Sequence, residues 1–152
     1  MSQENVERVR TSIEDGMSGQ GEYDADGMLI KLPDEELFDP QIEWDASEVP
    51  VLDISGVYRG IEGVRQYWRQ WYAAWQVLHY DYRLLDAGDR VVGLFDSQRM
   101  RGRSTGIEVP VPKYATVMTF RDGRLVHFKL YMNQSEALEA VGLSEQDAHA
   151  DS

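Results

Sequence analysis

The chain has 152 residues, enough for one domain that buries most of the surface its unfolded form exposes. Its 27 acidic and 15 basic residues give a net charge of −12, which repels phosphate backbones, so nucleic acid is not an expected partner. There is no cysteine, which excludes disulfides and suits the reducing cytoplasm, and no apolar run approaches the roughly 20 residues of a membrane span.

The first part of the chain predicts short helices followed by a strand. Apolar residues at three- and four-residue steps predict a helix over 3–16, and weaker spacing predicts a second short helix within 23–32. The Asp-Ala-Asp-Gly run at 24–27 lacks the later acids of a calcium loop and is interpreted as a turn. One more helical turn is expected over 33–38, and strict alternation predicts a strand over 41–46.

Residues 61–75 form the strongest predicted helix. Large side chains at three- and four-residue steps make one broad stripe along it, namely Val64, Trp68, Trp71, Tyr72 and Trp75. We expect this stripe to be core, with some of its rings lining a cavity.

Period-two patterns then predict four long strands and a closing helix. The strands are expected near residues 78–84, 92–101, 109–120 and 125–133. Asp122-Gly123 supplies the positive φ angles of a two-residue hairpin turn between the last two. Ser135 is expected to cap the helix, which ends at Gly142.

This order predicts an α+β fold in which a strongly bent antiparallel sheet wraps around the long helix and encloses a pocket. A single domain is expected over residues 1–143. Residues 144–152 are polar and acidic and are expected to be a disordered tail.

Several segments together resemble one known family. They are Ile42-Glu-Trp-Asp45, Gly56-Val-Tyr-Arg-Gly60, Arg101-Gly-Arg-Ser-Thr-Gly106, Phe120-Arg-Asp-Gly123 with Tyr131, and the run from Ala137 to Leu143. From about Val6 to Leu143 the chain resembles the SnoaL-like branch of the nuclear transport factor 2-like superfamily, whose relatives include ketosteroid isomerases, polyketide cyclases and epoxide hydrolases. The resemblance implies a cone-shaped, cystatin-like α+β barrel with a deep pocket. It does not imply one function, because the superfamily also contains dehydratases and non-catalytic modules.

The resemblance also implies a homodimer formed by the outer faces of the sheets. Strand alternation supports this, because Phe95, Val117 and Tyr131 are expected on the outer face and are too apolar for a face left in water. Arg99 and Arg101 on that face could pair with acids across a two-fold axis.

Two carboxylates are candidates for acid–base work in the pocket. Asp45 ends the first short strand, where the proton-shuttling aspartate of the resembled isomerases lies. The alternative is that Asp45 caps the following loop through backbone N–H groups, and both interpretations stay open. Asp96 is expected on the same strand face as Leu94, Gln98 and Met100, so on an inner face it would be a buried carboxylate in the site, and the alternative is a structural hydrogen bond to a nearby Tyr or Trp.

Other residues are expected to contact a ligand, either through ring faces or through hydroxyl and amide groups. They are Trp44, Tyr58, Trp68, Trp71, Tyr80, Gln98, Tyr114 and Leu130. No metal signature appears among three scattered histidines, and no cofactor is expected.

The resembled mechanisms are each incomplete in this chain. Gln98 and Leu130 stand where epoxide hydrolases would have acids, the strand over 114–120 lacks the second acid of the isomerases, and His127 is expected to point outward. Two functions therefore remain: a cofactor-free isomerase, dehydratase or cyclase acting on a small hydrophobic molecule, or a non-catalytic ligand-binding or dimerisation module.

Overall fold

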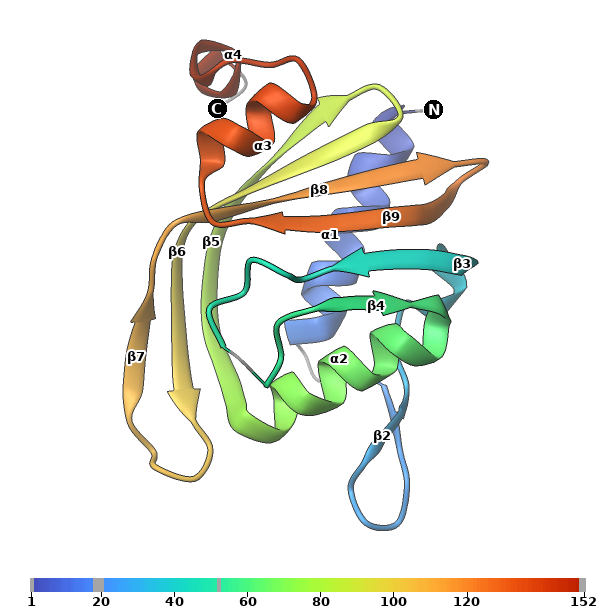
Figure 1. Ribbon diagram of the computed structural model, residues 1–152, viewed down its shortest axis with the longest axis vertical. Coiled ribbons are helices and arrows are strands. Elements are labelled where there is room, and N and C mark those ends of the chain that lie inside the picture. The colour runs from blue at the N-terminus through green and yellow to red at the C-terminus, as the bar shows by residue number, and fades with distance from the viewer. Residues whose placement is uncertain (1, 18–20, 52, 151–152) are drawn as a thin grey trace.

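The computed structural model describes residues 2–17, 21–51 and 53–150 (Figure 1). The elements in chain order are α1 Ser2–Met17, β1 Glu22–Tyr23, β2 Leu29–Lys31, η1 Glu35–Leu37, β3 Phe38–Asp45, β4 Val57–Arg59, α2 Gly60–Ala74, β5 Trp75–Ala87, β6 Arg90–Gly102, β7 Glu108–Val111, β8 Tyr114–Arg121, β9 Arg124–Tyr131, α3 Gln134–Ala140 and α4 Glu145–Ala150.

Within the described residues, one sheet of seven strands carries the fold. Its order is β4-β3-β9-β8-β6-β5, and β7 pairs with the part of β6 beyond β8. The pairs are antiparallel except β3 with β9, which is parallel. The predicted hairpin turn between β8 and β9 is confirmed, with φ of 53° at Asp122 and 78° at Gly123.

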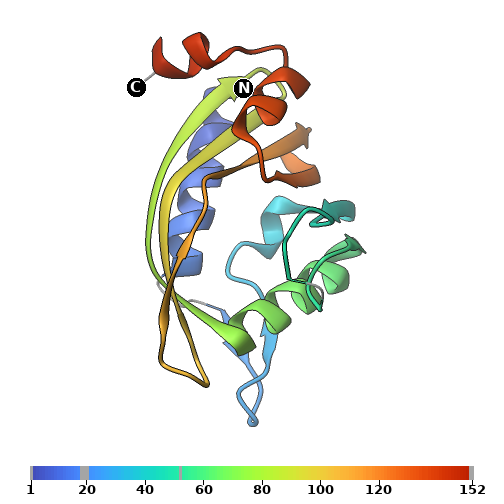
Figure 2. The same cartoon turned by 60° about the vertical axis from the view of Figure 1, so that its left-hand side comes forward.

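The sheet is strongly curved. Figure 2 shows β5 and β6 bending along their length, with α1 beside them and α2 near the end where β5 begins. The sheet is not closed into a barrel, because β4 and β5 form its two ends. The predicted cone-shaped α+β fold is confirmed.

A β-bulge at Asp96 changes which residues of β6 face inward. Asp81 of β5 pairs with Ser97, and the next residue, Tyr82, pairs with Phe95, so that Asp96 has no partner on β5. An extra residue of this kind reverses the alternation on one side of it. The uniform alternation predicted from Leu94 to Met100 is therefore wrong.

The core divides between the two faces of the sheet. On the inner side, Trp44 stacks on Phe128 with ring centroids 3.7 Å apart and an interplanar angle of 9°, and Ile42 and Val64 are fully buried. On the outer side, α3 and α4 cover an apolar cluster made of Leu85, Val92, Leu94, Ala115, Val117, Ala137, Leu138 and Ala148. Val117 is thus buried within the chain and is not available to a second copy, contrary to the prediction.

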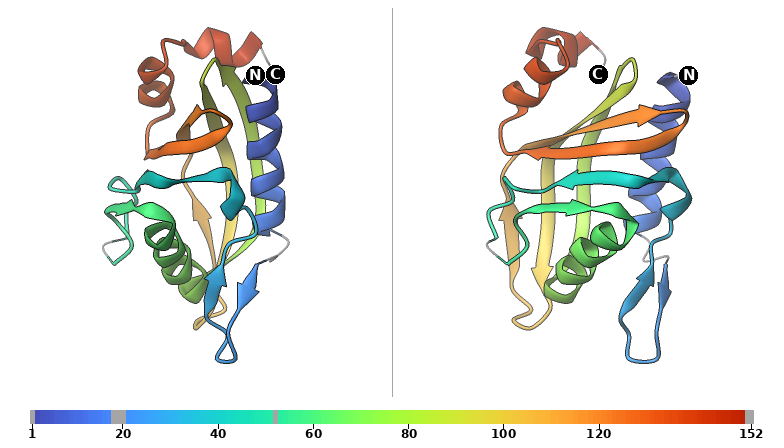
Figure 3. Two further views of the ribbon diagram at one scale, coloured as in Figure 1. Left: turned by 90° about the vertical axis from the view of Figure 1, so that its right-hand side faces the viewer. Right: turned by 45° about the vertical axis from the view of Figure 1, so that its right-hand side comes forward.

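Residues 23–32 form no helix. They make the turn and second strand of the β1–β2 hairpin, which extends away from the main sheet (Figure 3). The carboxylate of Asp24 accepts hydrogen bonds from the N–H groups of Asp26 and Met28, both at 2.9 Å, and Gly27 has φ of 82°. This local turn competes with helix formation, which explains the wrong prediction.

The chain after Leu143 differs from the expected disordered tail. Residues 145–150 form α4, which begins where Ser144 donates its N–H to the carboxylate of Asp147 at 2.8 Å, and Ala148 is buried. The predicted cap of α3 is also wrong, because Asn133 accepts the N–H of Glu136. In the described ranges no helix is long and apolar enough to cross a membrane.

Candidate functional site

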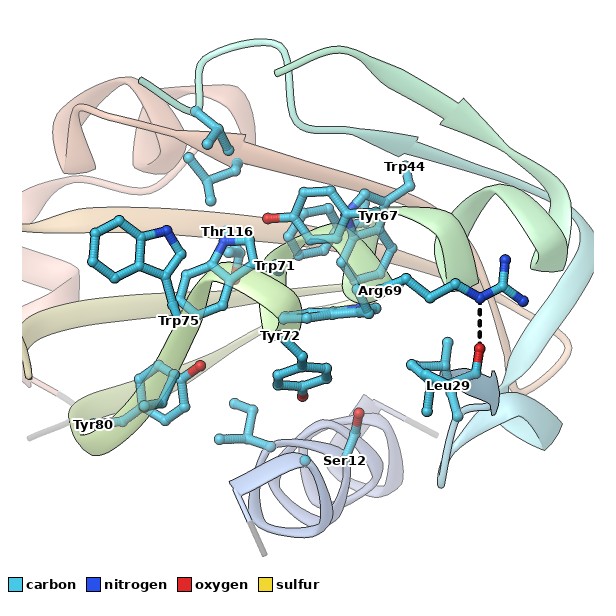
Figure 4. Close-up of a pocket in the computed structure, with 18 of the residues that line it drawn as sticks. Ser12, Leu29, Trp44, Tyr67, Arg69, Trp71, Tyr72, Trp75, Tyr80 and Thr116 are labelled. Atoms are coloured by element: carbon cyan, nitrogen blue, oxygen red, sulfur yellow. Dashed lines mark hydrogen bonds between the residues drawn. The ribbon is translucent and has the colours of Figure 1, made fainter. Parts of the chain in front are cut away.

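A cavity of about 930 Å³ lies between α1, α2, the β1–β2 hairpin and the inner face of the sheet. Figure 4 shows side chains from these elements converging on it. Most of its wall is apolar or aromatic. Its aromatic lining consists of Tyr23, Phe38, Trp44, Tyr67, Trp68, Trp71, Tyr72, Trp75, Tyr80, Phe95, Tyr114 and Phe128.

The helical period of α2 explains why so many rings reach the cavity from one element. Side chains three and four residues apart share a helix face, so Trp68, Trp71 and Tyr72 point to the same side. Trp68 stacks on Tyr72 with centroids 5.3 Å apart and meets Trp71 at 6.1 Å. The indoles pack against one another along the wall and leave the space beyond them open.

A pair of polar side chains from two strands lies on the sheet wall of this cavity. The hydroxyl of Tyr114 on β8 donates a hydrogen bond to the Oε1 atom of Gln98 on β6. Burial raises the pKa of Tyr114 well above its ordinary value, and burial also raises the pKa of Tyr80 nearby. Both hydroxyl groups therefore stay protonated and can donate a hydrogen bond at neutral pH.

Two buried polar atoms on the cavity wall lack a normal hydrogen bond within the described part of the chain. They are Nε1 of Trp44 and Oγ1 of Thr116, and Thr116 is only 4% exposed. Buried polar groups almost always have a partner, so each of these two atoms carries the cost of a missing hydrogen bond. Sequence reasoning missed Thr116, because a threonine in a strand is usually explained by β propensity alone.

Asp34 is a carboxyl group on the cavity wall that sequence reasoning also missed. It directly precedes η1 and accepts a hydrogen bond from the hydroxyl of Ser12 on α1. Burial raises the pKa of Asp34 above its ordinary value of 3.8, and the neighbouring acids Asp15 and Glu35 act in the same direction. The only signal in the sequence was an acid at the start of a helical turn, which is a common capping position.

The neighbouring residue Glu35 fixes this segment. Arg65 of α2 holds its carboxylate through two hydrogen bonds, at 2.8 and 2.6 Å, and the N–H of Leu32 adds a third at 2.7 Å. Although burial opposes ionisation, these donors lower the pKa of Glu35. The bidentate pair holds the Asp34 segment against α2 and so helps to place Asp34 at the cavity.

Asp45 lies outside the cavity lining. Its carboxylate accepts hydrogen bonds from the N–H and hydroxyl of Ser47, at 3.0 and 2.6 Å, and lies 3.9 Å from Nζ of Lys129. Burial opposes ionisation, but Ser47 and Lys129 lower the pKa of Asp45. This arrangement is the loop cap that was the alternative interpretation of the sequence.

Asp96 is also outside the cavity, on the outer face of the sheet. The bulge turns its carboxylate toward Arg83, whose Nε and Nη2 atoms lie 2.9 and 3.3 Å from it, and toward the amide of Gln134 at 3.3 Å. The hydrogen bond from Arg83 lowers the pKa of Asp96. The prediction that Asp96 faces the pocket is wrong, and Phe95 occupies the inner face instead, where it stacks on Tyr114 at 4.7 Å.

The other predicted contact residues divide in the same way. Tyr58 is not on the wall, because its hydroxyl donates to the carbonyl oxygen of Ile54 at 2.6 Å beneath the loop. The predicted contact residues that do line the cavity are Trp44, Trp68, Trp71, Tyr80, Gln98, Tyr114 and Leu130. Among the described residues, no cluster of three or more His, Asp or Glu side chains is placed to hold a metal ion.

Comparison with protein families identifies the chain. A sequence model of the SnoaL-like domain matches residues 13–128, which is most of the chain. The chain belongs to the SnoaL-like family. No curated protein matches the SnoaL-like chain.

Solved structures of low sequence identity share its fold. A nuclear transport factor 2-like protein of unknown function from Burkholderia pseudomallei superposes with a TM-score of 0.64 and 20% identity, covering 91% of this chain and 97% of the other. TerC, co-crystallised with polyporic acid, has a TM-score of 0.62 and 16% identity, with coverages of 90% and 97%. A protein with a ketosteroid isomerase-like fold from Catenulispora acidiphila, in complex with trimethylamine, has a TM-score of 0.52 and 19% identity, with coverages of 74% and 82%.

Proposed function

We propose that this SnoaL-like protein binds a small, largely apolar molecule in the cavity between α1, α2 and the sheet. The observation that supports this most is the wall itself, where aromatic rings surround a space of about 930 Å³ and a few polar groups converge on it. Gln98 and the hydroxyl groups of Tyr80 and Tyr114 would orient a carbonyl or hydroxyl group of the ligand. Two proteins of the same fold were crystallised with small molecules, which agrees with this role.

Cofactor-free acid–base catalysis of the isomerase, dehydratase or cyclase type is the alternative. The carboxylates first proposed for it, Asp45 and Asp96, are ion-paired outside the cavity lining, so neither contacts a ligand held there. Binding is therefore better supported than catalysis by these two carboxylates, and Asp34 is the carboxyl group that a catalytic role would have to use. Turnover of the bound ligand that Asp45→Asn or Asp96→Asn abolishes, with affinity unchanged, would favour the enzyme instead.

We also propose a homodimer through the outer face of β5 and β6, as the family resemblance implies. Asp81 and Arg101 bring both signs of charge to this exposed region, beside the ion pair that Arg99 and Glu108 form within the chain, so two copies can pair opposite charges across a two-fold axis. Sedimentation equilibrium should give twice the mass of one chain, and Arg101→Glu should shift the protein toward the monomer. The cytoplasmic location remains a prediction from the sequence.

The ligand-binding proposal is tested in two steps. Native mass spectrometry of the purified protein should detect a bound small molecule, and tryptophan emission should change when apolar ketones and phenols are titrated, because Trp68, Trp71 and Trp75 line the cavity.

A matched pair of variants then locates the site. Val77→Phe adds a ring to the cavity wall and should weaken binding at least tenfold, whereas Val57→Phe adds the same ring at an exposed position away from it. An unchanged emission spectrum across the panel, or equal loss of affinity in both variants, would contradict the proposal.

A further inference from the structure

The charged side chains on the cavity wall differ in the hydrogen-bond partners that they have. Arg69 donates to both carboxylate oxygens of Glu62, at 2.8 and 3.3 Å, and to the carbonyl oxygen of Leu29 (Figure 4). Arg103, at the rim, donates to the carbonyl oxygen of Tyr72. Both cations on this wall thus already have acceptors.

Asp34 has no such counter-charge. Its hydrogen-bond donors are neutral, namely the hydroxyl of Ser12 and its own backbone N–H, and none of the salt bridges among the described residues includes it. The charged groups acting on it most strongly are Asp15 and Glu35, which are acids. A carboxylate removed from water needs a compensating positive charge or a proton, so the ionised form of Asp34 lacks a counter-charge on this wall.

An aromatic pair, Tyr72 and Trp68, lies on the wall near the carboxyl group of Asp34. Tyr72 points from α2 toward Ser12 on α1 (Figure 4), and its hydroxyl lies near Gly16, where a Cβ atom would be 3.5 Å from it. Burial and the nearby Asp34 raise the pKa of Tyr72 to about 12. Trp68 stacks on the Tyr72 ring, and faces of Trp and Tyr rings attract cations.

We propose that the wall formed by Asp34, Ser12, Tyr72 and Trp68 binds a protonated amine carried by the ligand. The Asp34 carboxylate supplies the counter-charge, Ser12 holds the carboxylate by its hydrogen bond, and the two rings contact the carbon atoms around the nitrogen. This inference rests on the proposed function, since it assumes that the cavity holds a small molecule. The net charge of −12 would also attract a cationic ligand to the protein.

The inference makes binding dependent on pH. The groups facing Asp34 are Asp15 from α1, Glu35 from η1 and Tyr72 from α2, and Tyr23 and Arg103 act in turn on Tyr72. A cation binds the ionised carboxylate, so amine affinity should rise as the pH passes through the raised pKa of Asp34 and should then level off.

Calorimetric titration with three matched compounds tests the amine site. Benzylamine and benzyl alcohol differ in charge at nearly equal size, and benzyltrimethylammonium keeps its charge at every pH. We expect both cations to bind the wild-type protein at least tenfold more tightly than the alcohol. Asp34→Asn should remove this preference and Ser12→Ala should reduce it. Asp89→Asn, which removes one negative charge from an exposed loop position, should preserve it.

The outcomes separate the inference from the function beneath it. Equal affinities for benzylamine and benzyl alcohol, or an amine preference that survives Asp34→Asn, would overturn the amine site and leave ligand binding in the cavity intact. Absence of binding by all three compounds, together with no co-purified ligand, would contradict the proposed function and the inference with it. Thermal melting of each variant confirms that the substitution leaves the protein folded.

Discussion

The guanidinium group of Arg83 holds the carboxylate of Asp96 from two sides on the outer face of the sheet, with Nε 2.9 Å from Oδ2 and Nη2 3.3 Å from Oδ1. Arg83 also donates to the carbonyl oxygen of Ala148, so the pair links β5, β6 and α4. This relationship gives Asp96 a structural contact and leads to the first prediction.

Asp96→Asn should lower the free energy of unfolding by about 1 kcal/mol, because the charge-assisted pair is partly exposed. Since the pKa of Asp96 is lowered in the folded state, its contribution is present at neutral pH and is lost as the pH falls through that lowered value. Urea unfolding at pH 7 and pH 3 should show a difference between wild type and variant that shrinks in acid. Unchanged stability at pH 7 would contradict this assignment.

Asp34 should show the opposite dependence on pH. Because its folded-state pKa is raised above 3.8, the stabilisation from its protonated form is present in acid and lost as the pH rises through the folded-state value. Asp34→Asn removes this effect, so the stability of the variant relative to wild type should increase between pH 4 and pH 8. Melting temperatures of variant and wild type across this range measure the change. For the control Asp89→Asn, the difference in melting temperature from wild type should stay nearly constant with pH.

Thr116→Val tests the unpartnered hydroxyl on the cavity wall. Valine has nearly the same shape and removes the cost of burying Oγ1 without a hydrogen bond. The free energy of unfolding should therefore rise by about 1 kcal/mol. The affinity for a ligand in the cavity should stay nearly the same, because Oγ1 has almost no surface open to the cavity. Chemical denaturation and calorimetry on the same samples separate the two effects, and a destabilised variant would show that the hydroxyl has a partner.

Glu35→Gln should destabilise the protein by about 3 kcal/mol, because it leaves Arg65 without the carboxylate that faces it at the edge of the core. Glu62 offers a matched control, since it pairs with the same arginine but its side chain is 64% exposed. Glu62→Gln should cost less than about 1 kcal/mol. Equal losses in the two variants would show that burial of Glu35 does not determine the effect.

The main elements of the fold could be predicted because their patterns are long and regular. The aromatic stripe of α2 and the Asp122-Gly123 hairpin depend on local periodicity and turn chemistry, which a single sequence contains. The β1–β2 hairpin was missed because its strands are short and its turn depends on the side chain of Asp24. Residues 145–150 were missed because their helix packs through Ala148, a contact that composition does not reveal.

The candidate site was harder to predict because one residue reverses the strand pattern. The bulge at Asp96 exchanges the faces of Phe95 and Asp96, so the carboxylate expected inside lies outside and the ring expected outside lines the cavity. Nothing in the local sequence distinguishes a bulged strand from a regular one of the same composition. Asp34 was missed for a different reason, since its burial depends on α1 and α2, which are far from it along the chain.

The β1–β2 hairpin pairs only with itself, although Tyr23, Met28 and Leu29 reach the cavity. Its length and side chains can therefore be altered without disturbing a single hydrogen bond of the seven-stranded sheet. Exchanging this hairpin between family members offers a direct way to change which molecules enter the cavity, while the seven-stranded sheet that supports the cavity stays constant.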